Sequence, residues 1–113
     1  MTDAGNDRHR SWTFLTNHAH VMLCIARDPD VRLRDIAGQV GITERAAQGI
    51  VADLVAGGYV TRTRVGRRNR YQLVPALPLR HPLEHDRCVG ELLELLTGRA
   101  AARPRRAART ATA

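Results

Sequence analysis

The feature of the sequence that most constrains its fold is a pair of short apolar patterns, residues 34–40 and 43–56, joined through Gly41. In both patterns apolar residues recur at three- and four-residue spacing, which is typical of amphipathic helices. The residues expected to face inward are Ile36, Ala37, Val40, Ala47, Ile50, Val51 and Leu54. Gly41 predicts a turn, and Thr43 predicts an N-cap for the second helix. Two helices connected in this way form a helix-turn-helix unit.

A basic β-hairpin is expected directly after the second helix, which Gly57 and Gly58 bring to an end. Residues 59–65 and 70–74 are rich in β-branched and aromatic side chains, a composition typical of strands. The four residues between them, "GRRN", predict the turn. Five arginines and no acidic residue lie between Arg62 and Arg70, so the hairpin concentrates positive charge in one place.

A first helix is expected over residues 12–27, with Ser11 as its N-cap. Apolar residues recur along it at helical spacing, and Pro29 prevents the helix from continuing. Residues 31–33 are expected to form a short strand before the helix-turn-helix unit. Residues 1–10 have the polar composition expected of a disordered segment.

A last helix is expected over about residues 82–96. Three prolines in residues 75–82 predict an extended connector, and Pro82 suits the first position of a helix. The Ala- and Arg-rich segment 98–113 is expected to be disordered. The predicted fold is therefore mainly α-helical with one small β-hairpin, in the order α-β-α-α-β-β-α, as a single domain over residues 11–97.

The net charge of +7 is concentrated in two segments of the chain. The hairpin and the segment 98–113 each carry five arginines and no acid, whereas the rest of residues 11–97 is acidic on balance. Localised positive patches are typical of proteins that bind polyanions. The hairpin and the C-terminal segment are therefore the candidate contacts for nucleic acid.

Residues 11–97 resemble the winged helix-turn-helix transcriptional regulators of the MarR and ArsR kind. The likeness lies in "LRDIAGQVGITERAAQGIVADLVAGGYVTRTRVGRRNRYQL", with its capped helix from Thr43 and its arginine-rich turn before Tyr71. The resemblance implies a sequence-specific regulator of transcription that binds double-stranded DNA. The helix over about residues 43–56 would lie in the major groove, and the hairpin over residues 62–70 would be a wing on the backbone or in the minor groove.

The resemblance also assigns roles to individual residues. Arg45 and Gln48 are the expected base readers, since arginine suits the two acceptors of guanine and glutamine suits adenine. Thr43 and Glu44 are the other outward positions expected to face bases. The expected contacts with the DNA backbone are Arg62, Arg64, Arg67, Arg68, Asn69 and Arg70. Gly49 departs from the pattern, because such helices often carry a basic residue there.

The last helix predicts a homodimer. Its apolar stripe exposes more surface than packing on a small core requires, and such patches usually mark an interface. The residues expected at the dimer seam are Trp12, Leu15, Val89, Leu92, Leu93 and Leu96. Two recognition helices about 34–36 Å apart would read a palindromic DNA site.

Two sets of side chains offer an alternative chemistry, namely a metal or redox site. They are His18, His20 and Cys24 on the first helix, and His81, His85 and Cys88 on the last. The sequence contains no closed set of four ligands, and the paired cysteines of the ArsR metal sensors are absent from the second helix of the motif. Packed or surface histidines are therefore the preferred interpretation, and no cofactor or metal is expected.

Other classes of function remain as alternatives or are disfavoured. No nucleophile, base and orienting acid cluster in the sequence, so an enzyme is not expected. No apolar run reaches the ~20 residues that cross a bilayer, and a cytoplasmic protein without membrane contact is expected. A winged helix that docks on proteins is the main alternative. A binder of RNA or single strands is a weaker one, because the basic surface lacks aromatic residues for stacking. The sequence leaves open whether a small effector binds.

Overall fold

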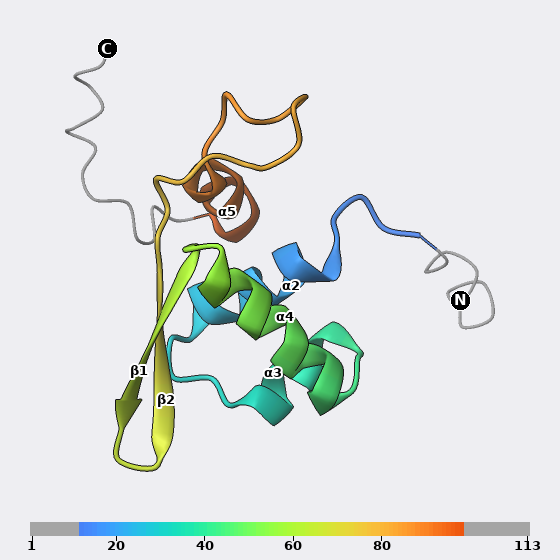
Figure 1. Cartoon of the computed structure of the whole chain (residues 1–113). Helices are drawn as coiled ribbons and strands as arrows, with labels where there is room; N and C mark the ends of the chain where they lie inside the picture. Colours follow the sequence, from blue (N-terminus) through green and yellow to red (C-terminus); the bar gives the residue numbers. More distant parts are fainter. Residues whose placement is uncertain (1–11, 99–113) are drawn as a thin grey trace.

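A computed structural model describes residues 12–98 of the chain (Figure 1). The expectations of disorder in residues 1–10 and after Gly98, and of an N-cap at Ser11, lie outside these residues. The described residues form four helices and two strands: α2 (Asn17–Arg27), α3 (Leu33–Val40), α4 (Glu44–Ala56), β1 (Val60–Val65), β2 (Arg68–Leu73) and α5 (Val89–Thr97). The predicted class, mainly helical with one antiparallel hairpin, is therefore confirmed.

A single apolar core holds these elements together. Helix α2 packs against α3, α4 and α5, while β1 packs on α4 and β2 packs on α2. Val21, Ile36 and Ala47, one from each of the first three helices, are fully buried. The hairpin runs along one side of the helices, and its turn points away from α5 (Figure 1).

The joint between α3 and α4 forms as the sequence predicts. Gly41 adopts the left-handed conformation, with φ of 88°, and its N–H donates to the carbonyl of Ala37 at 2.8 Å. Glycine takes this conformation without the steric penalty that a Cβ imposes. Thr43 then caps α4, because its hydroxyl accepts a hydrogen bond from the N–H of Ala46 at 3.0 Å. The chain thereby turns sharply between two helices that pack on each other.

The first helix begins later than predicted, at Asn17 rather than at Trp12. Thr16 is the N-cap residue, with extended backbone angles of −79° and 168°. The preceding residues fold locally instead: Trp12 and Phe14 stack edge to face with ring centroids 5.2 Å apart. Apolar spacing alone therefore predicted five helical residues too many at this end.

No strand forms at residues 31–33, contrary to the prediction. Asp28 accepts a hydrogen bond from the N–H of Val31 at 3.0 Å, which makes a turn, and α3 already begins at Leu33. One backbone bond, from the N–H of Tyr71 to the carbonyl of Pro29 at 3.0 Å, ties this segment to β2. Val31 is buried as part of the core without joining the sheet.

The hairpin has a tighter turn than predicted. Val65 pairs with Arg68, so only Gly66 and Arg67 lie between the strands instead of the four residues 66–69. Strand β2 accordingly starts at Arg68, two residues before the expected position. The turn of the hairpin is therefore short, and four of the five hairpin arginines lie on the strands.

The last helix is also shorter than predicted, starting at Val89 rather than at Pro82. The carboxylate of Glu91 accepts a hydrogen bond from the N–H of Cys88 at 2.9 Å, which fixes the start of α5. The two ends of the connector lie next to each other, because the N–H of Gly90, at the start of α5, donates to the carbonyl of Pro75 at 2.9 Å. The carbonyl of Arg87 and the N–H of Val89 also bond to Leu79 and Leu77, so this backbone cannot continue a helix from residue 82.

Gly90 lies where the connector crosses α5. A Cβ at this position would lie 2.6 Å from the Cβ of Pro75 and 2.9 Å from its carbonyl oxygen. Only glycine allows the two segments to approach this closely. Over the described part of the chain, no helix is both long enough and apolar enough to cross a lipid bilayer.

Candidate nucleic-acid interface

A basic notch of ≈ 410 Å³ lies between the hairpin, α4 and the start of α3. Its lining consists of Arg32, Leu33, Gln48, Val51, Arg62, Arg67, Arg68, Asn69 and Tyr71. The side chains of Val51 and Tyr71 are buried and belong to the core, whereas all four arginines are exposed. The fold thus gathers positive charge from two elements around one polar residue of α4, Gln48.

The register of the hairpin explains why Arg62 faces the notch. Arg62 pairs with Tyr71 across the two strands, and Val60 pairs with Leu73. Side chains alternate between the faces of a strand, so Arg62 shares the face of the buried Val60 and Tyr71. Arg62 is the next residue of β1 on this face after the buried Val60. It is exposed, and it lines the notch together with Gln48 and Val51 of α4.

Asp30 holds one of the expected DNA contacts in an ion pair. Arg70 Nε donates to Asp30 Oδ1 at 2.8 Å, and Arg70 Nη2 donates to Asp30 Oδ2 at 3.3 Å. Arg68 Nη2 donates to the backbone carbonyl of Asp30 at 2.6 Å. The hydrogen bonds from Arg70 hold the pKa of the Asp30 carboxyl below its usual value. Arg70 is therefore a structural partner of the segment before α3, a role that the sequence analysis missed.

The expected base readers lie on the exposed side of α4. Thr43 is occupied as the helix cap, while Glu44, Arg45 and Gln48 are exposed in the first half of the helix. Gln48 lines the notch together with hairpin arginines, whereas Arg45 and Glu44 do not. Arg64 also lies outside the notch lining, although it is exposed on β1. The structure therefore brings Gln48, and not the whole expected set, next to the hairpin.

The residues expected at a dimer seam divide into three groups by exposure. Val89 and Leu93 are buried in the chain's own core, with Leu93 only 2% exposed. Trp12 and Leu96 remain exposed, while Leu15 and Leu92 are partly buried. Phe14, which the sequence analysis did not single out, is 91% exposed. The surface that is left without a partner within residues 12–98 thus includes aromatic residues before α2 as well as the outer side of α5.

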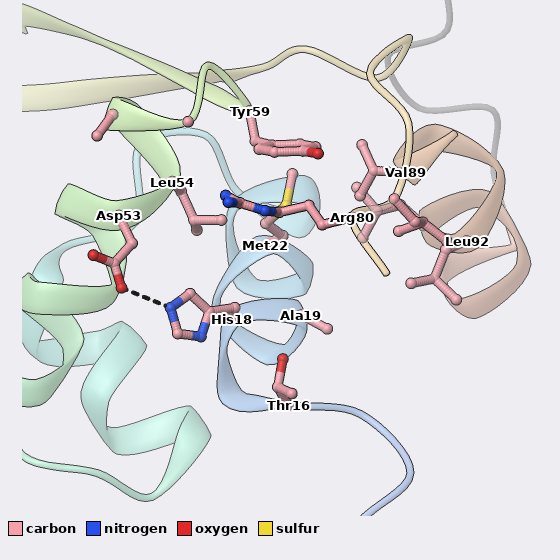
Figure 2. Close-up of a pocket in the computed structure, with 14 residues that line it drawn as sticks. Thr16, His18, Ala19, Met22, Asp53, Leu54, Tyr59, Arg80, Val89 and Leu92 are labelled. Carbon is pink, nitrogen blue, oxygen red and sulfur yellow. Dashed lines mark hydrogen bonds and ion pairs between the residues drawn. The ribbon is translucent and has the colours of Figure 1, made fainter. Parts of the chain in front are cut away.

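A second cavity, which we call the apolar groove, was not expected from the sequence. It has a volume of ≈ 710 Å³ and lies between α2, the end of α4 and α5 (Figure 2). At one side His18 Nε2 donates to Asp53 Oδ2 at 2.8 Å, which joins α2 to α4. Arg80, from the connector, reaches into the groove. The sequence carries no signal for the pair, because its members are 35 positions apart.

His20 and His81 make local hydrogen bonds. His20 Nδ1 lies 3.0 Å from Asn17 Oδ1, and His81 Nδ1 accepts a hydrogen bond from the N–H of Leu83 at 3.0 Å. No three His, Cys, Asp or Glu side chains gather into a metal-binding group within residues 12–98. Burial raises the pKa of the Cys24 thiol, which disfavours the thiolate that a redox sensor needs.

Comparison with known protein families gave no match for this chain, and comparison of its sequence with curated proteins gave none either.

Proposed function

We propose that this protein is a double-stranded DNA-binding regulator of transcription with a winged helix-turn-helix fold. Helices α3 and α4 are the helix-turn-helix unit, α4 is the recognition helix, and the hairpin of β1 and β2 is the wing. The observation that carries the proposal is the basic notch, where Gln48 of α4 and the hairpin arginines border one cavity. A regulator of this kind acts in the compartment that holds its DNA, and we propose that this compartment is the cytoplasm.

The charges around the notch support a polyanionic partner. Arg32, Arg62 and Arg67 form no ion pair or hydrogen bond with any side chain among residues 12–98, so their guanidinium groups are available to phosphates. Guanidinium groups bind phosphate oxygens in a bidentate manner, which favours arginine at such sites. Each phosphate that is neutralised releases counterions, so binding should weaken steeply as salt concentration rises.

The exposed face of α4 supports sequence reading. Its first half presents Glu44, Arg45 and Gln48 to solvent, with the small Gly49 and Ala52 beside them. A helix with small residues on its outer face can approach the floor of a major groove closely. Arg45 and Gln48 are the proposed base readers, because both can make bidentate contacts with base edges.

We further propose that the regulator acts as a homodimer. The exposed apolar side chains Trp12 and Phe14 before α2, and Leu95 and Leu96 on α5, supply surface that a partner copy can bury. Val89 and Leu93 stabilise the dimer only indirectly, by holding α5 on the core. A two-fold arrangement presents two recognition helices to one palindromic site.

The first test compares two arginines of the same hairpin. Arg67→Ala should weaken binding to duplexes of any sequence and reduce the slope of log affinity against log salt by about 0.9, because one phosphate contact is lost. Arg70→Ala serves as the matched control and should change the slope less, since Asp30 already holds this guanidinium. Fluorescence anisotropy with a labelled duplex at several salt concentrations measures both quantities.

Two results would contradict this part of the proposal. Equal slopes for wild type and Arg67→Ala would remove the hairpin from the DNA interface. The absence of any salt-dependent duplex binding by the wild-type chain would favour the alternative function, a winged helix that docks on proteins.

The second test concerns assembly. Leu96→Asp should shift the protein toward monomer in sedimentation equilibrium, because a carboxylate cannot be buried cheaply at an apolar seam. Leu83→Asp is the control, since Leu83 is exposed in the connector and is not one of the side chains proposed for the seam. A dimer with about 8 kcal/mol of association free energy has a dissociation constant near 1 µM. A wild-type chain that stays monomeric at about a hundred times that concentration would rule out the homodimer.

A further inference from the structure

The apolar groove has the dimensions of a site for a small organic molecule. Its volume of ≈ 710 Å³ lies within the range of about 300–1,000 Å³ that is usual for ligand pockets. Met22, Leu54 and Leu93 line it, and all three also belong to the buried core. These walls come from α4 and α5, which each pack on α2, and from α2 itself, while the connector adds Leu79 and Arg80 to the lining.

One charged side chain in the groove, that of Arg80, forms no ion pair with any of residues 12–98. Arg80 extends across the groove between Tyr59 and Met22 (Figure 2). Its Nη1 lies 3.4 Å from the position that a Cβ on Gly57 would occupy, so the absence of a side chain at Gly57 makes room for the guanidinium. No carboxylate or carbonyl oxygen within residues 12–98 bonds to the Arg80 side chain. A guanidinium that lies over apolar walls and has no anionic partner can form charge-assisted hydrogen bonds with a bound anion.

The other charges at the groove limit what that anion can be. Asp53 is the acidic residue of the lining, and one of its oxygens is bound by His18. The hydroxyl of Tyr59 donates to the carbonyl of Pro78, so it is also occupied. A ligand with a single negative charge can pair with Arg80 while its uncharged part avoids Asp53. A second negative charge on the ligand would be repelled by the Asp53 carboxylate.

We propose that the apolar groove binds a small monocarboxylic acid with an apolar body. The carboxylate pairs with the guanidinium of Arg80, and the apolar part of the acid lies against Met22, Leu54 and Leu93. This inference is independent of the proposed DNA binding, because it rests on groups at the opposite side of α4 from the notch residue Gln48.

Arg80 also lies next to the C-terminal end of α4, where a positive charge interacts favourably with the helix dipole. That role alone would make Arg80 a stabilising residue with no ligand. The two roles differ in their consequences, because only a ligand site distinguishes a carboxylate from an uncharged molecule of the same shape. The test therefore uses matched probes as well as variants.

The probes are cyclohexanecarboxylate, its neutral amide, and the dianion 1,4-cyclohexanedicarboxylate. The chain contains two methionines, Met1 and Met22, so protein labelled with ¹³C at the methionine methyl groups gives a simple spectrum. The Met22 signal, assigned with Met22→Leu, should shift saturably with the monocarboxylate. We expect its dissociation constant to be at least tenfold lower than that of the amide, and the dianion to bind more weakly than the monoanion.

Arg80→Gln should remove the tenfold preference for the acid over the amide. Arg34→Gln is the matched control, because Arg34 is an exposed arginine on α3 that lines neither cavity, and its loss changes the net charge equally. Arg80→Lys keeps the positive charge and should keep part of the preference, which separates the charge from any effect of Arg80→Gln on folding.

Three results would overturn the proposal. The acid and the amide could shift the Met22 signal equally, or neither could shift it at millimolar concentration. The preference for the acid could survive in Arg80→Gln. Finally, the Met22 signal of the free protein could move on dilution, which would mean that a second copy of the chain fills the groove.

Discussion

The basic notch and the apolar groove are built on the same helix but differ in how their charges are compensated. The notch uses Gln48 and Val51 from the middle of α4, and the groove uses residues from Asp53 to Gly57 at its end. Among residues 12–98, four arginines and no acidic side chain line the notch. The groove has one arginine that pairs with no side chain of the described residues, one aspartate paired with His18, and mostly apolar walls.

This difference indicates two different kinds of partner. A dense group of cations with little apolar wall suits a polymer with repeated charges, because no single small anion satisfies all of them. A single cation over apolar walls suits one small amphipathic anion. One helix can therefore take part in two recognition events, provided that its two ends respond independently to substitution.

The largest effect is expected from Leu93→Ala, which removes a side chain shared by the core and the groove. Leu93 is buried on α5, and truncation of such a leucine lowers the free energy of unfolding by about 2–5 kcal/mol. Urea denaturation measures the loss. Leu83→Ala is the control: Leu83 is 87% exposed in the connector, and its truncation should change stability by no more than about 0.5 kcal/mol.

If the two regions are independent, the folded fraction of Leu93→Ala should still bind duplex DNA with the wild-type salt slope. A changed slope at low urea would show that α5 and the notch are coupled through the core. That outcome would show that the notch and the groove do not respond independently to substitution.

A smaller effect is expected from Gln48→Ala. A bidentate contact to a base is worth about 1–3 kcal/mol of discrimination, so this variant should lose preference at one or two positions of a selected DNA site. Arg80→Gln should select the same site as wild type, because Arg80 lies in the groove. Selection from a random duplex library measures both, and an unchanged motif for Gln48→Ala would exclude it as a base reader.

The smallest effect is expected from Asp30→Asn, which releases Arg70. The released guanidinium should strengthen binding to duplexes of any sequence and steepen the salt slope by up to about 0.9. Stability should fall slightly at neutral pH, since the ion pair is exposed to solvent and such pairs contribute little. Weaker duplex binding by Asp30→Asn would mean that Asp30 orients Arg70 toward DNA rather than withholding it.

The pH dependence of this variant has a defined sign. The pKa of Asp30 is lowered in the folded state, so the pair stabilises the fold above the unfolded-state pKa of about 3.9. That contribution is lost as the pH falls through the folded-state value. The difference in stability between wild type and Asp30→Asn should therefore be constant near neutral pH and shrink below about pH 4.

The parts of the fold that local sequence determines were predicted well. Thr43 and Gly41 act within a few residues of themselves, and the cap and the turn form where these residues stand. The hairpin was predicted because its strands are adjacent in the chain, although its turn is two residues shorter than expected. Local signals thus sufficed for α3, α4 and the presence of the hairpin.

The errors arose where backbone groups form hydrogen bonds other than those of the predicted element, either with another segment or within a local turn. The helix expected from Pro82 does not form, because the backbone before α5 bonds to residues 75–79. The strand expected at 31–33 is replaced by a turn and the start of α3. Apolar spacing does not show either kind of bond, so it overestimates the length of helices and strands.

In the candidate sites too, local sequence signals were predicted and contacts between distant residues were not. Sequence reasoning grouped the hairpin arginines correctly as one basic element, but it could not show that Asp30 holds Arg70. It also interpreted His18 as a packed or surface histidine, and it could not show that His18 pairs with Asp53 at the edge of the groove. The groove depends on three helices and the connector meeting in space, and no single stretch of sequence predicts that arrangement.

The contact between Pro75 and Gly90 has a consequence for how this chain can vary. Because Pro75 fills the space where a side chain would begin, position 90 is closed to every other amino acid unless the connector moves. The far end of the same loop, residues 81–87, is exposed throughout and carries no core residue. Insertions and deletions are best tolerated at exposed loop tips. Evolutionary or engineered changes in length should therefore accumulate between His81 and Arg87, while the base of the loop keeps its glycine.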